Sequence, residues 1–155
     1  DPTFLEITGY SLKRLYDQLG KLPAKDIVVM LDSCFSGTGE RSVITKGMRP
    51  AVINVENPLL AGEKIVVLTA GTGVQTSSTY HQKSHGLFTY FLLKGLQGAA
   101  DLNQDSKIDL AELYSYLKPQ VQGMARREFN NDQAPQLLGN PDILRRGISL
   151  FEFTK

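Results

Sequence analysis

The single cysteine of the chain, Cys34, is the residue best suited to nucleophilic chemistry. It follows an apolar, β-branched run at 27–31 and Asp32, and a loop containing Gly37 and Gly39 comes after it. Such a run is typical of a buried parallel strand, and ligands of open α/β sheets bind beyond the carboxyl ends of these strands. A thiol at this place would be held on a rigid strand end and open to solvent. The alternative is that Cys34 is a small buried hydrophobic residue, as many free cysteines are.

The residues around Cys34 resemble the catalytic cysteine segment of caspase-like peptidases, in particular metacaspases and their bacterial relatives. Residues 32–37 read Asp-Ser-Cys-Phe-Ser-Gly after a hydrophobic strand. The rest of the chain is similar to the family in the same order, with a core strand at 64–71, a substrate-cleft segment at 75–78 and the start of a helix at 85–90. The resemblance implies an α/β fold of the caspase-like three-layer type, in which a mostly parallel sheet carries helices on both faces.

The resemblance also implies roles for individual residues. Cys34 would be the nucleophile of a cysteine endopeptidase. Asp32 would help to form the pocket that accepts arginine or lysine before the scissile bond, and on a strand it would face the same side as Cys34. Gln75, Ser77 and Ser78 are weaker candidates for substrate contacts. The alternative is that Asp32 only caps a local turn and that the loop hydroxyls and amides are solvated.

A cysteine peptidase also needs a proton shuttle, which is usually a histidine, and no histidine precedes Cys34. In caspase-like enzymes the catalytic His-Gly lies upstream of the cysteine. His81 and His85 both follow the second predicted strand, so we interpret them as surface residues or residues at the start of a helix. We therefore expect a preceding segment or a partner chain to supply the catalytic histidine, and this chain alone to be nearly inactive. The alternative is a catalytically inactive, caspase-like regulatory or calcium-responsive interaction module.

The segment 101–112 has the spacing of an EF-hand calcium loop. Side-chain oxygens occupy the ligand positions and one backbone carbonyl would add to them, so the predicted ligands are Asp101, Asn103, Asp105, Lys107, Asp109 and Glu112. Ser106 stands where glycine usually allows a positive φ, which predicts strain and a weaker affinity. The alternative is an acidic helix–turn–helix in which Asp109 is an N-cap and Glu112 completes a capping box.

The chain of 155 residues has the length of one domain, and we expect a single caspase-like portion over 1–155. It divides into a helix, strand and nucleophile loop (1–37), an inter-subunit-type loop (38–62) and a small-subunit-like part (63–155). Periodicity and breaker residues predict helices at 11–22, at 87–96 and from 110 onward, and strands at 27–32, 64–69 and 148–153. Candidate self-processing sites in the loop are Arg41, Lys46 and Arg49.

Composition limits the partners. The net charge of +1 gives no electrostatic reason to expect nucleic acid. No apolar stretch approaches the roughly 18 residues of a membrane helix, so no membrane partner is expected. One cysteine cannot form an internal disulfide, which suits a cytoplasmic location. The chain begins with Asp1-Pro2, and we expect a processed or excised piece whose partners are the histidine-bearing segment and polypeptide substrates.

Overall fold

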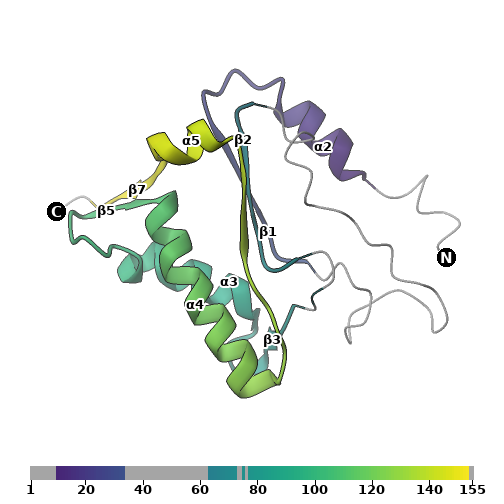
Figure 1. Cartoon of the computed structure of the whole chain (residues 1–155), viewed down its shortest axis with the longest axis vertical. Helices are drawn as coiled ribbons and strands as arrows, with labels where there is room; N and C mark the ends of the chain where they lie inside the picture. Colours follow the sequence, from purple (N-terminus) through teal and green to yellow (C-terminus); the bar gives the residue numbers. More distant parts are fainter. Residues whose placement is uncertain (1–9, 34–62, 73–74, 76, 154–155) are drawn as a thin grey trace, which may run out of the picture.

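The structure of the chain is a computed structural model, and it describes residues 10–33, 63–72, 75 and 77–153. These residues form a mixed α/β fold with a three-stranded central sheet and two smaller, two-stranded sheets (Figure 1). Cys34 and the predicted loop 38–62, with its candidate self-processing sites, lie outside the described residues. The strand that leads to Cys34 is described, as are the predicted core strand, residues 75, 77 and 78 of the predicted substrate-cleft segment, and the segment 85–90.

The described elements follow one another in the order α2 (Leu12–Leu19), β1 (Ile27–Leu31), β2 (Ile65–Thr69), β3 (Thr79–Tyr80), β4 (His85–Gly86), α3 (Leu87–Lys94), β5 (Lys107–Asp109), α4 (Leu110–Phe129), β6 (Gln136–Gly139), α5 (Pro141–Arg146) and β7 (Ser149–Glu152). A short 3₁₀ turn (His81–Lys83) separates β3 from β4, and a π-helical turn (Gly95–Ala99) continues α3.

The central sheet has the strand order β1-β2-β6. β1 and β2 are parallel, with Ile27 opposite Ile65 and Leu31 opposite Thr69, whereas β6 runs antiparallel to β2. The described sheet is therefore mixed, where the sequence predicted a mostly parallel one, because the chain returns after α4 in the opposite direction. The parallel pair brings the carboxyl ends of β1 and β2 to the same edge of the sheet, which is where the candidate site lies.

Helices pack on both faces of this sheet, because successive residues of the central strand β2 point to opposite sides. Ile65 and Val67 pack with Tyr16 of α2, and the partly buried side chains of β1 on that face join them. Val66 packs with residues of α4 and α5 on the other face, and Leu68 packs there with α3 and α4. All five residues of β2 are buried, which explains its continuous apolar and β-branched sequence.

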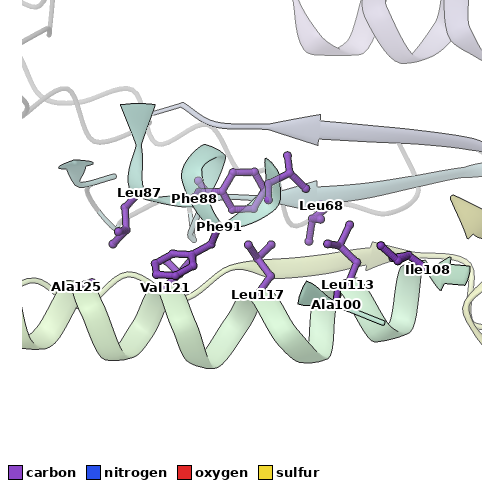
Figure 2. Packing of buried hydrophobic residues seen from close by; sticks show 12 residues of the cluster. Leu68, Leu87, Phe88, Phe91, Ala100, Ile108, Leu113, Leu117, Val121 and Ala125 are labelled. Atoms are coloured by element: carbon purple, nitrogen blue, oxygen red, sulfur yellow. The ribbon is translucent and has the colours of Figure 1, made fainter. Parts of the chain in front are cut away.

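The largest apolar cluster lies between α3, α4 and the sheet (Figure 2). α4 contributes Leu113, Leu117, Val121 and Ala125, which recur every four residues and are all fully buried. Phe88 and Phe91 of α3 belong to the same cluster, between this row and the sheet (Figure 2). The periodic stripe along α4 thus fixes α3, and with it the beginning of α3 at Gly86 and Leu87, against the sheet.

The predicted strands at 27–32 and 64–69 are confirmed as β1 and β2 to within one residue at each end. The predicted helix at 11–22 is confirmed but shorter, because α2 ends at Leu19 and Gly20, a poor helix former, becomes its C-cap. The helix predicted from 110 onward is α4.

The predicted helix at 87–96 corresponds to α3, which ends at Lys94 before the π-helical turn. The predicted final strand at 148–153 is β7, which pairs with β5 and adds no strand to the central sheet. The short elements β3, β4, β6 and α5 were not predicted. Within the part of the chain that the structure describes, no helix combines the length and apolar character needed to cross a membrane.

Candidate functional site

The segments that follow β1 and β2 carry the predicted substrate-binding residues that the structure describes. Asp32 and Ser33 follow β1 directly, and both side chains are exposed. Cys34 is the next residue of the chain, outside the described residues. The described part of the site consists of the residues around the carboxyl end of β1.

Three hydrogen bonds from two distant segments hold the Asp32 carboxylate. Its Oδ2 accepts from the Thr89 hydroxyl (2.6 Å) and from the Thr89 backbone N–H (3.2 Å). Its Oδ1 accepts from the Ser77 hydroxyl (2.9 Å). Asp32 therefore joins the end of β1 to the loop after β2 and to the first turn of α3.

For α3, Asp32 takes the place of an N-cap side chain. The N-cap residue of α3 is Gly86, which has no side chain to accept from the free N–H groups of the first turn. Asp32 accepts one of these, the N–H of Thr89, from a strand far away in sequence. A negative charge is also favourable at the positive end of a helix dipole. The alternative expected Asp32 to cap a local turn, whereas its hydrogen bonds go to a distant loop and to a distant helix.

The contact between Asp32 and α3 requires glycine at position 86. A Cβ atom placed on Gly86 would lie 2.2 Å from Asp32 Oδ2, a distance too short for any pair of nonbonded atoms. The φ of Gly86 is −61°, so the backbone conformation does not demand glycine. The requirement is one of space, and it arises from the close approach of the carboxylate.

Replacing Gly86 with alanine is therefore expected to displace the Asp32 carboxylate and to lower the free energy of unfolding by about 1–3 kcal/mol. Urea denaturation measures this change. Gly123→Ala is the matched control, because a Cβ there meets only the Arg127 guanidinium, at 3.9 Å within α4, and alanine favours the helix. A Gly86→Ala protein as stable as the parent would contradict this account of the contact.

Ser77 belongs to the Asp32 site, whereas Gln75 serves the loop behind it. The Ser77 hydroxyl donates to Asp32 and lies 3.3 Å from Nε2 of Gln133. The Gln75 side-chain oxygen accepts from the backbone N–H groups of Thr72 (3.2 Å) and Ala134 (2.9 Å). Of the three weaker candidates for substrate contacts, the structure thus brings Ser77 to Asp32, engages Gln75 in holding the loop to the segment before β6, and buries Ser78.

Three residues of this site were not predicted. Thr89 and Gly86 lie in the segment 85–90, which was interpreted only as the start of a helix. Gln133 is fully buried and accepts through Oε1 from the Ser78 backbone N–H (2.8 Å). The glycine at a helix N-terminus was the one available signal, since a helix without its own cap needs an acceptor from elsewhere.

The two histidines lie on the β3–β4 hairpin, which directly precedes α3 in the sequence. His81 is in the 3₁₀ turn and His85 in β4, and both are exposed. His85 directly precedes the N-cap of α3, which matches the interpretation of it as a residue at the start of a helix.

The predicted calcium loop is a compact turn between the π-helical turn and α4. The Asp101 carboxylate accepts from the backbone N–H groups of Asp105 and Ser106, each at 3.1 Å. Ser106 has φ 67° and Gln104 has φ 61°. The left-handed conformation expected at position 106 is thus present although the residue is serine, and Ile108 is fully buried beside it.

The end of this loop forms the capping box that was the alternative to a calcium site. The Glu112 N–H donates to Asp109 Oδ1 (2.8 Å), and the Asp109 N–H donates to Glu112 Oε2 (3.2 Å). Among the described residues, no group of three His, Cys, Asp or Glu side chains is arranged to hold a metal ion. The loop carboxylates are bonded to backbone N–H groups of their own segment, and calcium binding stays a prediction.

No family model matches the chain, and no curated protein or solved structure matches it. The function is therefore inferred from the residues and the geometry described above.

Proposed function

We propose that this chain is the nucleophile-bearing part of a caspase-like cysteine endopeptidase that cleaves polypeptides after arginine or lysine. The observation that supports this most is the placement of Asp32. An exposed carboxylate stands at the carboxyl end of β1, two residues before the only cysteine, and is fixed there by Ser77 and Thr89. The finer fold assignment, a caspase-like three-layer sandwich completed by further strands, is part of the same proposal.

The chemistry needs a thiolate, a proton carrier and donors for the oxyanion. The histidine takes the proton of the Cys34 thiol, and the sulfur attacks the scissile carbonyl carbon. In this proposal the Cys34 backbone N–H donates to the resulting oxyanion. The histidine then gives its proton to the leaving amine, and water hydrolyses the thioester to release the acyl part of the substrate and restore the thiol.

The Asp32 carboxylate has the capacity to select a basic side chain. A carboxylate offers about four lone-pair sites, and three hydrogen bonds occupy part of this capacity in Asp32. Because its two oxygens are fixed by Ser77 and Thr89, a guanidinium or ammonium group meets a charge that is already oriented. Such preorganised, charge-assisted hydrogen bonds favour arginine and lysine over neutral side chains.

The catalytic histidine is proposed to come from a preceding segment or a partner chain that pairs with β1. In the described sheet β1 lies at an edge, with β2 on one side only. All five residues of β1 are half-buried, whereas those of β2 are fully buried. An apolar edge strand offers a row of backbone donors and acceptors to an added strand. A parallel strand added there would end beside Asp32, two residues before Cys34 in the sequence, and we propose that it brings the histidine to the thiol.

The test is hydrolysis by the chain joined to, or mixed with, the histidine-bearing segment of its own protein. Peptides that differ only in the residue before the scissile bond (Arg, Lys, Leu or Asp) are compared by kcat/KM. Arginine and lysine peptides are expected to be cleaved, and a peptidyl-arginine chloromethylketone is expected to label Cys34. If all four peptides resist cleavage and Cys34 is not labelled, the inactive interaction module becomes the better assignment. A free thiol nucleophile also favours the reducing cytoplasm as the location.

We also propose that 101–112 binds calcium. The donors fit a hard cation, because every ligand position of the pattern offers an oxygen atom. The side-chain oxygens come from Asp101, Asn103, Asp105, Asp109 and Glu112, and the backbone carbonyl from Lys107. Calcium would join these groups into one unit. Glu112 would exchange its contact with the Asp109 N–H for the ion.

Calorimetric titration with calcium chloride is expected to give a dissociation constant of about 10⁻⁴–10⁻³ M. Glu112→Gln is expected to weaken binding by at least about tenfold, since even groups that only support ligands contribute that much. Glu128→Gln, an exposed carboxylate elsewhere on α4, is the matched control. Equal affinity in both variants, or absence of binding in the parent, would leave Glu112 with the capping role alone.

A further inference from the structure

Gln133 is a fully buried polar side chain whose hydrogen bonds all go to the segments of the candidate site. Its Nε2 donates to the Ala70 carbonyl (3.0 Å) and to the Ser77 hydroxyl (3.3 Å). Its Oε1 accepts from the Ser78 N–H (2.8 Å). The loop after β2 is therefore tied at three points to one amide. A buried amide of this kind holds its partners firmly, because leaving any of them unpaired is unfavourable.

The segment that carries Gln133 lies along the edge where the site is built. α4 ends at Phe129, and its C-cap residue Asn130, with a φ of 45°, turns the chain toward β6. β6 is antiparallel to β2, with Gln136 opposite Thr69, so the residues before β6 lie beside the carboxyl end of β2. The neighbours of Gln133 bind the same loop, since the Asn131 amide donates to the Ser78 hydroxyl (2.9 Å).

The hydrogen bonds have a defined direction from Gln133 to Asp32. The Ser78 N–H donates to Oε1, which sets the orientation of the amide and turns its NH₂ group toward Ala70 and Ser77. The Ser77 hydroxyl has one hydrogen, and it donates this hydrogen to Asp32 Oδ1. The contact with Gln133 then uses a lone pair of the same hydroxyl. The amide thus selects the rotamer in which Ser77 supports the carboxylate.

We propose that Gln133 is a positioning residue that sets the selectivity for basic substrates by holding Ser77, and through it the Asp32 carboxylate. This inference rests on the proposed function, because it assigns a determinant of specificity to the same site. Gln133 itself lies behind the loop and touches no substrate. Its effect reaches the substrate only through the charge that Ser77 and Thr89 orient.

The first experiment measures selectivity in the complete enzyme, with the histidine-bearing segment present. Gln133→Met keeps the shape of the side chain and removes its hydrogen bonds. It is expected to lower the ratio of kcat/KM for an arginine peptide to that for the isosteric citrulline peptide by about tenfold. In an Asp32→Asn background the same substitution is expected to leave this ratio unchanged. Gln136→Met, in the same segment but bonded only to the Ala134 carbonyl among the described contacts, is the matched control.

The second experiment does not depend on activity. The Thr89 N–H donates to Asp32, so its hydrogen exchange reports whether the carboxylate is held in place. Exchange at Thr89 is expected to rise about tenfold in Gln133→Met and to stay unchanged in Gln136→Met. Should Gln133→Met not fold, Gln133→Glu, which replaces the donor with an acceptor facing Ser77, is measured in its place.

The outcomes separate the two proposals. If the parent enzyme shows no preference for arginine but exchange at Thr89 still rises in the variant, the proposed peptidase specificity fails and the positioning of Asp32 stands. If the parent prefers arginine and Gln133→Met keeps both the ratio and the slow exchange, the positioning role of Gln133 is wrong. A ratio that falls equally in the Asp32→Asn background also overturns it, because the effect then bypasses Asp32.

Discussion

Replacing Cys34 with alanine is expected to reduce the hydrolysis of arginine and lysine peptides by at least about 10⁴-fold, as loss of the nucleophile does in other covalent hydrolases. The change removes the proposed nucleophilic sulfur and leaves the Asp32 carboxylate, with its contacts to Ser77 and Thr89, in place. Binding of an arginine peptide, followed by fluorescence anisotropy, is therefore expected to stay within about twofold of the parent, because no binding group is removed. Labelling by the peptidyl-arginine chloromethylketone is expected to disappear.

Ser33→Ala is the control for this experiment, because it makes a change of similar size at the preceding exposed position. It should keep both hydrolysis and labelling. Hydrolysis that persists in Cys34→Ala would end the assignment of a cysteine peptidase, whatever the substrate preference. Loss of binding together with activity would instead indicate that the alanine had disturbed the loop.

The elements that the sequence predicted well are those with one dominant physical cause. β1 and β2 are runs of apolar and β-branched residues because side chains pack on both faces of this sheet, and such runs have few alternatives. α4 shows its buried row every four residues. By contrast, β6 has only four residues, and its position depends on where α4 ends. The start of α5 did carry a signal, since Asn140 caps it and Pro141 occupies its first position.

The candidate site was only partly predictable because its residues come from four distant segments. The sequence indicated Asp32 and Ser77 separately, but it held no sign that they share a hydrogen bond or that Gln133 lies behind them. At 101–112 the sequence could not decide the structure for a different reason. Asp109 and Glu112 have the oxygens that both a capping box and a calcium loop need, so the same spacing supports both interpretations.

Asp32→Asn is expected to lower kcat/KM for arginine and lysine peptides by about 10²-fold and to leave a citrulline peptide nearly unaffected. The substitution removes the charge but keeps the shape. The amide oxygen can still accept from Thr89, and the amide nitrogen can donate to the Ser77 hydroxyl, so the cap of α3 is retained. The loss of rate then reports the charge pair that forms when the substrate enters and excludes water from the carboxylate.

Asp32→Ala removes both the negative charge and the cap of α3. Comparison with Asp32→Asn, which removes the charge alone, separates the two roles. Asp32→Ala is expected to lose the same preference for basic residues and, in addition, about 1–2 kcal/mol of the free energy of unfolding, because the first turn of α3 loses its acceptor. Asp17→Ala is the control, since the ion pair that Asp17 forms with Lys13 on α2 is exposed, and such pairs contribute little. If Asp32→Asn keeps the preference for arginine over citrulline, another group selects the basic residue. Asp32 is then a helix cap alone, and the specificity proposed for this site is wrong.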